Sequence, residues 1–195
     1  ANLPGNPQEK GLVDLDVGDG IFRACGFDDG ADGSPEEPRH VVMLHNGAMW
    51  TMLDTPCGGC SNYQFTAIAA APDGTVYLGG TITDFSAGAP DEYVAFLARR
   101  SPSGTWVDVP LPGPNTLDMV NDLLVASNGD LYAACGKNEA RVIRIPAGGV
   151  TRDEGPGVPG RMIALAEGPF GDIYGTGVTG TEEAPEPLLV VRRAD

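Results

Sequence analysis

One short phrase recurs four times along this sequence, and it constrains the fold more than any other feature. In each copy a Gly-centred turn leads into an apolar segment that carries an aromatic residue, and the copies lie at residues 17–22, 72–77, 128–132 and 170–174. The aromatic residues are spaced 42 to 55 residues apart and are Phe22, Tyr77, Tyr132 and Tyr174. A unit of this length cannot bury its own apolar face and packs on its neighbours. The period therefore predicts the repeated sheets of a β-propeller.

Each repeat divides into four short segments with the alternation and the β-branched and aromatic residues that are typical of strands. The first segments are predicted at residues 12–15, 65–70, 120–125 and 162–166, and the third at 40–45, 93–99, 141–145 and 188–192. The second segments carry the recurring aromatic residue, and the fourth begin near Trp50, Trp106 and Val150. Pro-Gly-type crossovers, which suit a chain leaving a sheet, join successive repeats.

We therefore expect an all-β fold, a single β-propeller domain over residues 1–195. Its four repeats are expected at roughly 8–58, 62–114, 117–160 and 161–195, and the last repeat lacks its outer strand. Either a four-bladed ring closes with a three-stranded blade, or these residues are part of a longer propeller. The recurring aromatic residues are expected to pack between neighbouring sheets.

The second repeat resembles a known family of repeats. Asp73-Gly74-Thr75-Val76-Tyr77, an apolar run into Arg99, and Gly104-Thr105-Trp106 resemble the repeat of NHL-type and streptogramin-lyase-like β-propellers. The resemblance extends over essentially the whole chain and implies the fold. Such families include lyases, lactonases, peptide-binding modules and scaffolds, so it does not fix an activity. No position matches a His/Glu catalytic pair, and the catalytic residues stay unknown.

The chain is strongly acidic, with a formal net charge of −15. Phosphate backbones and anionic membrane surfaces attract clustered basic residues, so no nucleic-acid partner is expected. The chain has no run of about 18 apolar residues, so membrane insertion is not expected either. Up-and-down strands place the long loops on one face of the predicted propeller. These loops carry the acidic residues Asp28, Asp29, Asp32, Glu36, Glu37, Asp84, Asp91, Glu92, Glu139, Glu182, Glu183 and Glu186. This acidic long-loop face favours a protein partner, a cationic ligand or a metal ion.

One of these loops is a candidate calcium site. Asp28, Asp32 and Glu36 have the i, i+4, i+8 spacing of calcium loops in some propellers, and calcium needs several oxygen ligands around one centre. Gly30 stands where a further carboxylate or amide is usual. The alternative is a solvated acidic loop rich in turn-forming residues.

The four cysteines allow three interpretations. In an oxidising compartment a disulfide from Cys25 to Cys57 or Cys60 would attach the first crossover to its own blade, and Cys135 completes the set of disulfide candidates. Alternatively, Cys25 and Cys135 occupy equivalent positions as small buried apolar residues. A zinc site would join Cys57 and Cys60 to His40, although structural zinc usually takes four ligands.

Taken together, these features favour a non-enzymatic binding or scaffold module, secreted or on the cell surface, that uses the acidic long-loop face. One alternative is a metal-dependent propeller lyase or hydrolase, with calcium as the candidate cofactor. Another is a structural subunit that assembles through the exposed strand edge of the last repeat.

Overall fold

The computed structural model describes residues 10–18, 21–28, 39–56, 62–84, 92–112, 117–148, 150–181 and 184–194. All regular structure within these ranges is strand, in agreement with the predicted all-β class. No helix in this described part of the chain is long and apolar enough to cross a membrane.

The strands follow one another as antiparallel neighbours. In chain order they are β1 (Lys10–Gly18), β2 (Ile21–Asp28), β3 (Arg39–His45), β4 (Trp50–Leu53), β5 (Tyr63–Ala70), β6 (Val76–Asp84), β7 (Glu92–Arg100), β8 (Trp106–Asp108), β9 (Val120–Val125), β10 (Leu131–Cys135), β11 (Glu139–Ile145), β12 (Arg152–Glu167), β13 (Ile173–Thr181) and β14 (Ala184–Arg192). They form two four-stranded sheets, β1–β4 and β5–β8, and a continuous six-stranded sheet, β9–β14.

The long strand β12 belongs to two sheets. Its first half pairs with β11 and its second half, from Gly160, pairs with β13. Gly160 has a φ of 135°, and a Cβ there would lie 2.1 Å from the carbonyl oxygen of Val178, so only glycine fits. We therefore treat β9–β11 with the first half of β12 as the third sheet, and the second half of β12 with β13 and β14 as the fourth sheet.

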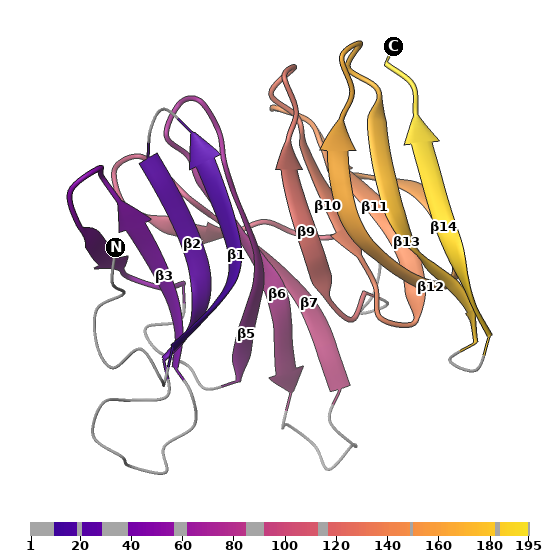
Figure 1. The fold of residues 1–195 in the computed structure, drawn as a ribbon, viewed down its shortest axis with the longest axis horizontal. Helices are drawn as coiled ribbons and strands as arrows, with labels where there is room; N and C mark the ends of the chain where they lie inside the picture. Colours follow the sequence, from indigo (N-terminus) through magenta and orange to yellow (C-terminus); the bar gives the residue numbers. More distant parts are fainter. Residues whose placement is uncertain are drawn as a thin grey trace.

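The four sheets stand side by side in sequence order, as Figure 1 shows from indigo to yellow. The first strands of the sheets, β1, β5, β9 and β12, are the inner strands, and each contacts the next. We call the three contacts between successive sheets the first, second and third seam. Each seam holds an apolar cluster, centred respectively on Phe65 and Leu78, on Val120 and Leu131, and on Tyr132 and Met162. This arrangement is that of a β-propeller, as predicted, whereas the exact repeat boundaries stay predictions.

The strand register corrects the predicted alignment of the first repeat. At one equivalent place in each sheet, the inner strand and the second strand pair as Asp14 with Cys25, Ala67 with Gly79, Asp122 with Ala134 and Ala164 with Thr176. Two residues before these second-strand partners stand Arg23, Tyr77, Tyr132 and Tyr174. Arg23, and not Phe22, therefore occupies the aromatic position in the first sheet. Phe22 is instead 38% exposed, and Cys25 and Cys135 are not equivalent.

Candidate functional site

Every inner strand carries a β-bulge at the same place. The register of pairing with the second strand shifts at Val13, Thr66, Asn121 and Ile163. A bulge inserts one extra residue, breaks the ladder and leaves main-chain groups without their usual partners. The side chains around these bulges therefore decide how the inner strands are held together.

Two carboxylates directly after the bulges satisfy main-chain amides on two strands each. The Asp14 side chain accepts the amide of Leu15 on its own strand and that of Ile68 on β5, both at 2.8 Å. The Asp122 side chain accepts its own strand's Leu123 at 2.9 Å and Leu165 of β12 at 2.6 Å. We call Asp14 and Asp122 the seam carboxylates. The four amides hold equivalent places in the four sheets, and each carboxylate accepts the amide of its own sheet and that of the next one. The second and fourth sheets therefore need no carboxylate of their own, and they have Ala67 and Ala164 at this position.

The bulged residues themselves bridge two of the seams. The Thr66 hydroxyl donates to the carbonyl oxygen of Val120 in the second seam. The Asn121 side-chain amide donates to the carbonyl oxygen of Gly136, just after β10 of its own sheet, at 2.7 Å, and across the third seam to that of Met162, at 2.8 Å. Because these donors bind carbonyls of the next inner strand, they fix the spacing between the sheets.

The pKa of Asp122 differs from that of an ordinary exposed Asp. Burial raises the pKa of Asp122, and the negative charge of Asp14 raises it further, against the lowering effect of the Leu165 and Leu123 amides. The carboxylates thus interact although they lie on different inner strands. Asp122 therefore keeps its proton to higher pH than an ordinary Asp does.

The seam carboxylates cross the first and the third seam, and ion pairs between outer strands occur at the same two seams. In the first seam Arg100 binds Asp54 at 3.0 Å, and the Trp106 indole donates to the Asp54 carbonyl oxygen at 2.9 Å. In the third seam Arg192 lies 3.5 Å from Glu154. Arg100 and Arg192 are equivalent, since they pair with Val76 and Ile173 in their own sheets. The first and third seams therefore share both a seam carboxylate and an outer ion pair.

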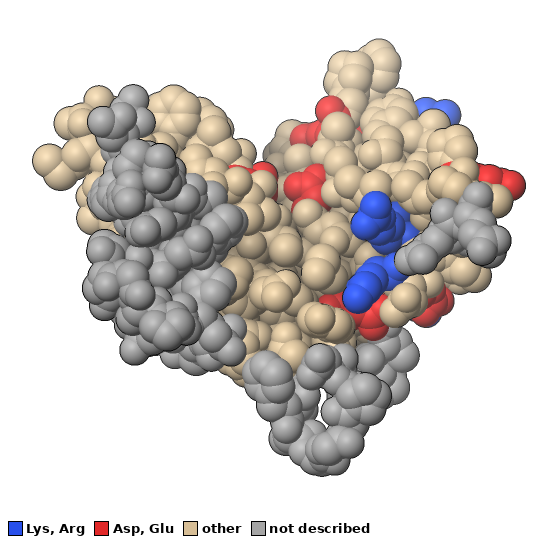
Figure 2. All heavy atoms as spheres, turned by 60° about the horizontal axis from the view of Figure 1, so that its bottom comes forward, with Lys and Arg blue, Asp and Glu red and all other residues tan. Residues whose placement is uncertain are grey.

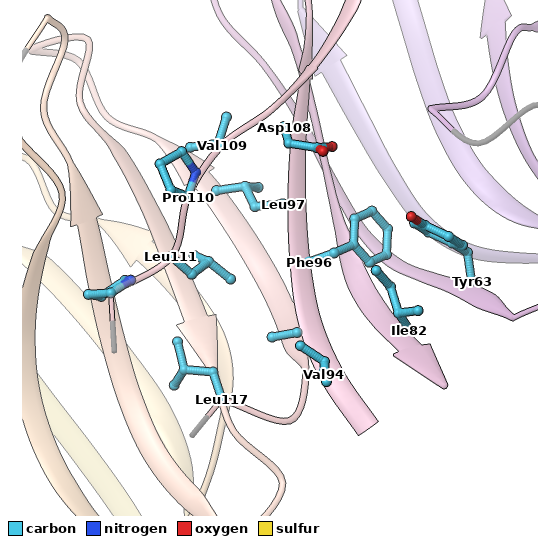
Figure 3. Close-up of a pocket in the computed structure, with 12 residues that line it drawn as sticks. Tyr63, Ile82, Val94, Phe96, Leu97, Asp108, Val109, Pro110, Leu111 and Leu117 are labelled. Carbon is cyan, nitrogen blue, oxygen red and sulfur yellow. The ribbon is translucent and has the colours of Figure 1, made fainter. Parts of the chain in front are cut away.

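A cavity of about 260 Å³ lies beside the second sheet (Figure 3). The segment after β8 forms one wall and is held on the edge of β7 by two hydrogen bonds of 2.8 Å, from Val109 to Leu97 and from Ala95 to Leu117. Tyr63, Ile82 and Phe96 face the space from the other side in Figure 3. Asp108 is the one carboxylate among the described lining residues. The lining suits an apolar group better than acid–base chemistry.

A second hollow, of about 400 Å³, opens where the tight turns meet in the second seam. Its walls include Asp73, Tyr77 and Arg99. Burial raises the pKa of Tyr77, the charge of Asp73 adds to this rise, and Arg99 opposes it. Because the phenol of Tyr77 becomes a weaker acid, it is a poor proton carrier at neutral pH.

Most of the predicted metal and disulfide residues cannot be placed. Asp32, Glu36, Cys57 and Cys60 lie outside the described residues, and of Asp28 only the backbone, at the end of β2, is described. The described residues contain no group of three or more His, Cys, Asp or Glu side chains that could hold a metal ion. The calcium loop and the zinc site with His40 therefore stay predictions.

Cys25 and Cys135 are free, fully buried thiols. Burial raises the pKa of each to about 12, and a carboxylate adds to it, Asp14 for Cys25 and Asp153 for Cys135. Such thiols behave as small apolar residues. Because Cys25 is a free thiol in the structure, the predicted disulfide from Cys25 to Cys57 or Cys60 is not present in it.

His40 is half-buried at the start of β3. Its Nδ1 accepts the amide of Phe65 at 3.4 Å, and its ring meets the Phe65 ring edge-on with centroids 5.6 Å apart. Burial lowers the pKa of His40, so the neutral imidazole predominates at neutral pH.

The acidic long-loop face is described only in part. Of its predicted acidic residues, the side chains of Glu139 and Glu186 are described, and Glu139 is bound to Arg141 at 2.8 Å. Figure 2 shows a notch between the lobe of the N-terminal strands and that of the C-terminal strands, with acidic side chains along it and basic ones nearby. Whether this face binds a partner stays a prediction.

Comparison with known proteins shows the fold. No protein-family model and no curated protein matches the chain. Among the solved structures that match is a presumed gluconolactonase, with 16% identity over 80% of this chain and 67% of that chain and a TM-score of 0.46. Xylan beta-1,4-xylosidase from Bacillus halodurans C-125 matches with 16% identity over 94% of this chain and 41% of that chain and a TM-score of 0.53. A catalytically inactive virginiamycin B lyase from Staphylococcus aureus with quinupristin matches with 14% identity over 97% of this chain and 72% of that chain and a TM-score of 0.49. The likeness to the xylosidase, with a TM-score of 0.53, supports the resemblance in fold.

These neighbours also correct the predicted function. All three are described as enzymes, and the chain spans between 41% and 72% of their lengths. The expectation of a non-enzymatic binding or scaffold module is wrong by this comparison, and the lean against an enzyme has no support. Likenesses at 14–16% identity show the fold alone, so these neighbours assign no activity to this chain.

Proposed function

We propose that this chain forms part of a propeller hydrolase or lyase in which Asp122 transfers the proton and Asp14 is its charged neighbour. One observation carries the proposal: the inner strands hold two interacting carboxylates, and burial together with Asp14 raises the pKa of Asp122. Pairs of acidic groups whose surroundings separate their pKa values are typical of acid–base sites.

The hydrogen bonds of Asp122 support this role. Its two oxygens each accept one main-chain amide, from Leu123 and Leu165, so the carboxylate is held in one orientation. Each oxygen keeps a second lone pair for a water or a substrate hydroxyl. A general base needs both this fixed orientation and a raised pKa.

Asp122 serves either reaction class. In a hydrolysis its carboxylate takes a proton from water while the water oxygen forms the new bond, and the leaving group departs with that proton. In an elimination it takes a proton from the carbon next to the breaking bond, the electron pair forms the double bond, and the proton passes to the leaving group. In both reactions the negative charge of Asp14 favours the protonated form of Asp122.

Calcium is the proposed cofactor, and the described residues supply only part of a site for it. Asp14 and Asp122 are hard oxygen donors of the kind that calcium prefers, but their oxygens already accept amides. With no group of three ligands in the described ranges, no reaction step is assigned to a metal. The proposed calcium site is the loop with Asp28, Asp32 and Glu36, of which Asp32 and Glu36 lie outside the described residues.

The test is turnover of three chromogenic or chromatographic probes, a lactone, a xyloside and a streptogramin, by wild type and by Asp122→Asn. The amide keeps one acceptor for the main-chain amides but cannot act as a base, so the rate is expected to fall by about 10²–10⁴-fold. Asp54→Asn, at a carboxylate that is 60% exposed and lines neither cavity, is the matched control and keeps the wild-type rate. No turnover of any probe by wild type, or full activity in Asp122→Asn, contradicts the proposal.

A further inference from the structure

The two ends of the row of sheets present apolar surfaces that correspond to the two halves of an internal seam. On the fourth sheet we define the open face as Ala164, Ala166, Tyr174, Leu189 and Val191. By register these residues match Ala67, Ala69, Tyr77, Leu97 and Arg99 of the second sheet.

The equivalent residues of the second sheet are covered by the third sheet. Ala67, Ala69 and Leu97 are 0%, 4% and 2% exposed. They lie in one cluster with Val120 and Leu123. On the open face, by contrast, Leu189 is 65% and Val191 38% exposed. The fourth sheet therefore keeps the apolar character of a packed sheet without the neighbour that buries it.

The first sheet carries the opposite half of the seam. Leu12, Leu15 and Phe22 are 44%, 48% and 38% exposed. Their equivalents in the third sheet, Val120, Leu123 and Leu131, are 0%, 6% and 1% exposed. We call these three residues the leading patch. Ala24 and Met43, farther from the inner strand, are buried, so the leading patch is confined to the inner strand and Phe22.

Within one chain the two surfaces do not meet. The inner strands contact each other in the order β1, β5, β9, β12, and no comparable contact joins β12 to β1 in the described part of the chain. Figure 1 likewise shows the yellow and indigo sheets at opposite ends of the row.

We infer that the open face of the fourth sheet packs on the leading patch of a second copy of this chain. The occupant follows from the repeat: the surface that covers such a face in the second seam has Val, Leu and Leu at the positions where the leading patch has Leu12, Leu15 and Phe22. The contact is head-to-tail, so it produces a closed ring when the rotation between copies allows it.

The proposed seam between two copies is apolar, as the second seam is. Ile163 and Ala164 stand where the second seam has Thr66 and Ala67, so neither a hydroxyl nor a seam carboxylate bridges it. Each copy carries a net charge of −15, and this repulsion weakens association at low ionic strength. Added salt screens the repulsion and leaves the apolar contact, so the dimer strengthens as salt rises.

Sedimentation velocity over a concentration series, at low and moderate salt, tests the inference on the 195-residue chain. Wild type is expected to form a discrete oligomer. Leu189→Arg is expected to weaken it by about tenfold or more, because a charge enters the centre of an apolar contact. Phe170→Arg is the matched control: Phe170 is 85% exposed, lies off the open face, and its replacement leaves association unchanged. Thermal unfolding checks that both variants fold.

Cysteine cross-linking tests the head-to-tail geometry. Chains with Leu15→Cys and chains with Leu189→Cys are oxidised separately and as a mixture, and only the mixture is expected to yield a covalent dimer. A monomer at all concentrations overturns the inference. An oligomer that Leu189→Arg does not weaken, or covalent dimers in the separate samples alone, also overturns it. All of these readouts are masses, so they do not depend on the proposed enzymatic function.

Discussion

Replacing Asp122 by alanine tests whether the seam carboxylates hold the inner strands together. The substitution leaves the amides of Leu123 and Leu165 without acceptors. An unsatisfied buried amide costs about 1–3 kcal/mol, and because Asp122 is only partly buried we expect a total loss of about 2–4 kcal/mol. The measurement is the free energy of unfolding from urea denaturation, with an unchanged m-value as the sign that the same surface is exposed.

Two further variants make this test specific. Asp14→Ala removes the equivalent acceptor of Leu15 and Ile68 and is expected to cost a similar amount. Asp108→Ala removes an exposed carboxylate with no hydrogen bond among those described and is expected to cost less than about 0.5 kcal/mol. If Asp122→Ala is as mild as Asp108→Ala, water satisfies the bulge amides and the seam carboxylates are dispensable for the fold.

The pH dependence of the same difference provides a second check. Because the pKa of Asp122 is higher in the folded than in the unfolded chain, the folded protein binds more protons in the window between the two values. The contribution of Asp122 to stability is therefore greatest below the unfolded pKa and decreases as pH rises through the folded one. The free-energy difference between wild type and Asp122→Ala should grow as pH falls, and a difference that shrinks contradicts the assigned direction.

Three other outcomes follow from the structure. Gly80→Ala should destabilise the fold by about 3 kcal/mol or more, because a Cβ there would lie 1.9 Å from the Gln64 carbonyl oxygen, and urea denaturation measures the loss. Cys25 and Cys135 should resist alkylation in the native protein and react in urea, as peptide mass mapping would show, because both are buried with a pKa raised to about 12. Asp54→Ala should cost less than about 1 kcal/mol and less still in high salt, since the Asp54 side chain that binds Arg100 is 60% exposed.

The fold was predictable because its signal is local and repeated. Each tight turn needs a residue with positive φ, and Gly74, Gly129 and Gly171 supply it at φ values of 88°, 85° and 80°. Each such glycine precedes a strand residue whose burial demands an apolar side chain, so turn and strand mark every repeat together. The error in the first repeat has the same origin: Ile21-Phe22 imitates the apolar-aromatic pair, whereas strand register places Arg23 in the aromatic position.

The seam carboxylates were not predicted, because a bulge is a property of pairing that leaves no residue type of its own in the sequence. A signal was nevertheless present. Asp14-Leu15, Ala67-Ile68, Asp122-Leu123 and Ala164-Leu165 lie at the same place in the four inner strands. An acidic residue inside an apolar strand, present in alternate repeats, indicates a partly buried carboxylate that needs hydrogen-bond donors. Here the donors are main-chain amides beside the bulges.

This alternation means that the structural unit is two sheets rather than one. The first and third seams each have a seam carboxylate and an outer ion pair, Arg100 with Asp54 and Arg192 with Glu154. Among the described residues the second seam shows neither, and it is held by the Thr66 hydroxyl and the cluster around Val120. Seams between units are therefore apolar, and seams within units are polar at both the inner and the outer strands. The open face of the fourth sheet is the outer side of the second two-sheet unit and corresponds to the side of the second sheet that faces the second seam. We therefore expect the surface that packs on it to present an apolar inner strand, without a carboxylate or an ion pair.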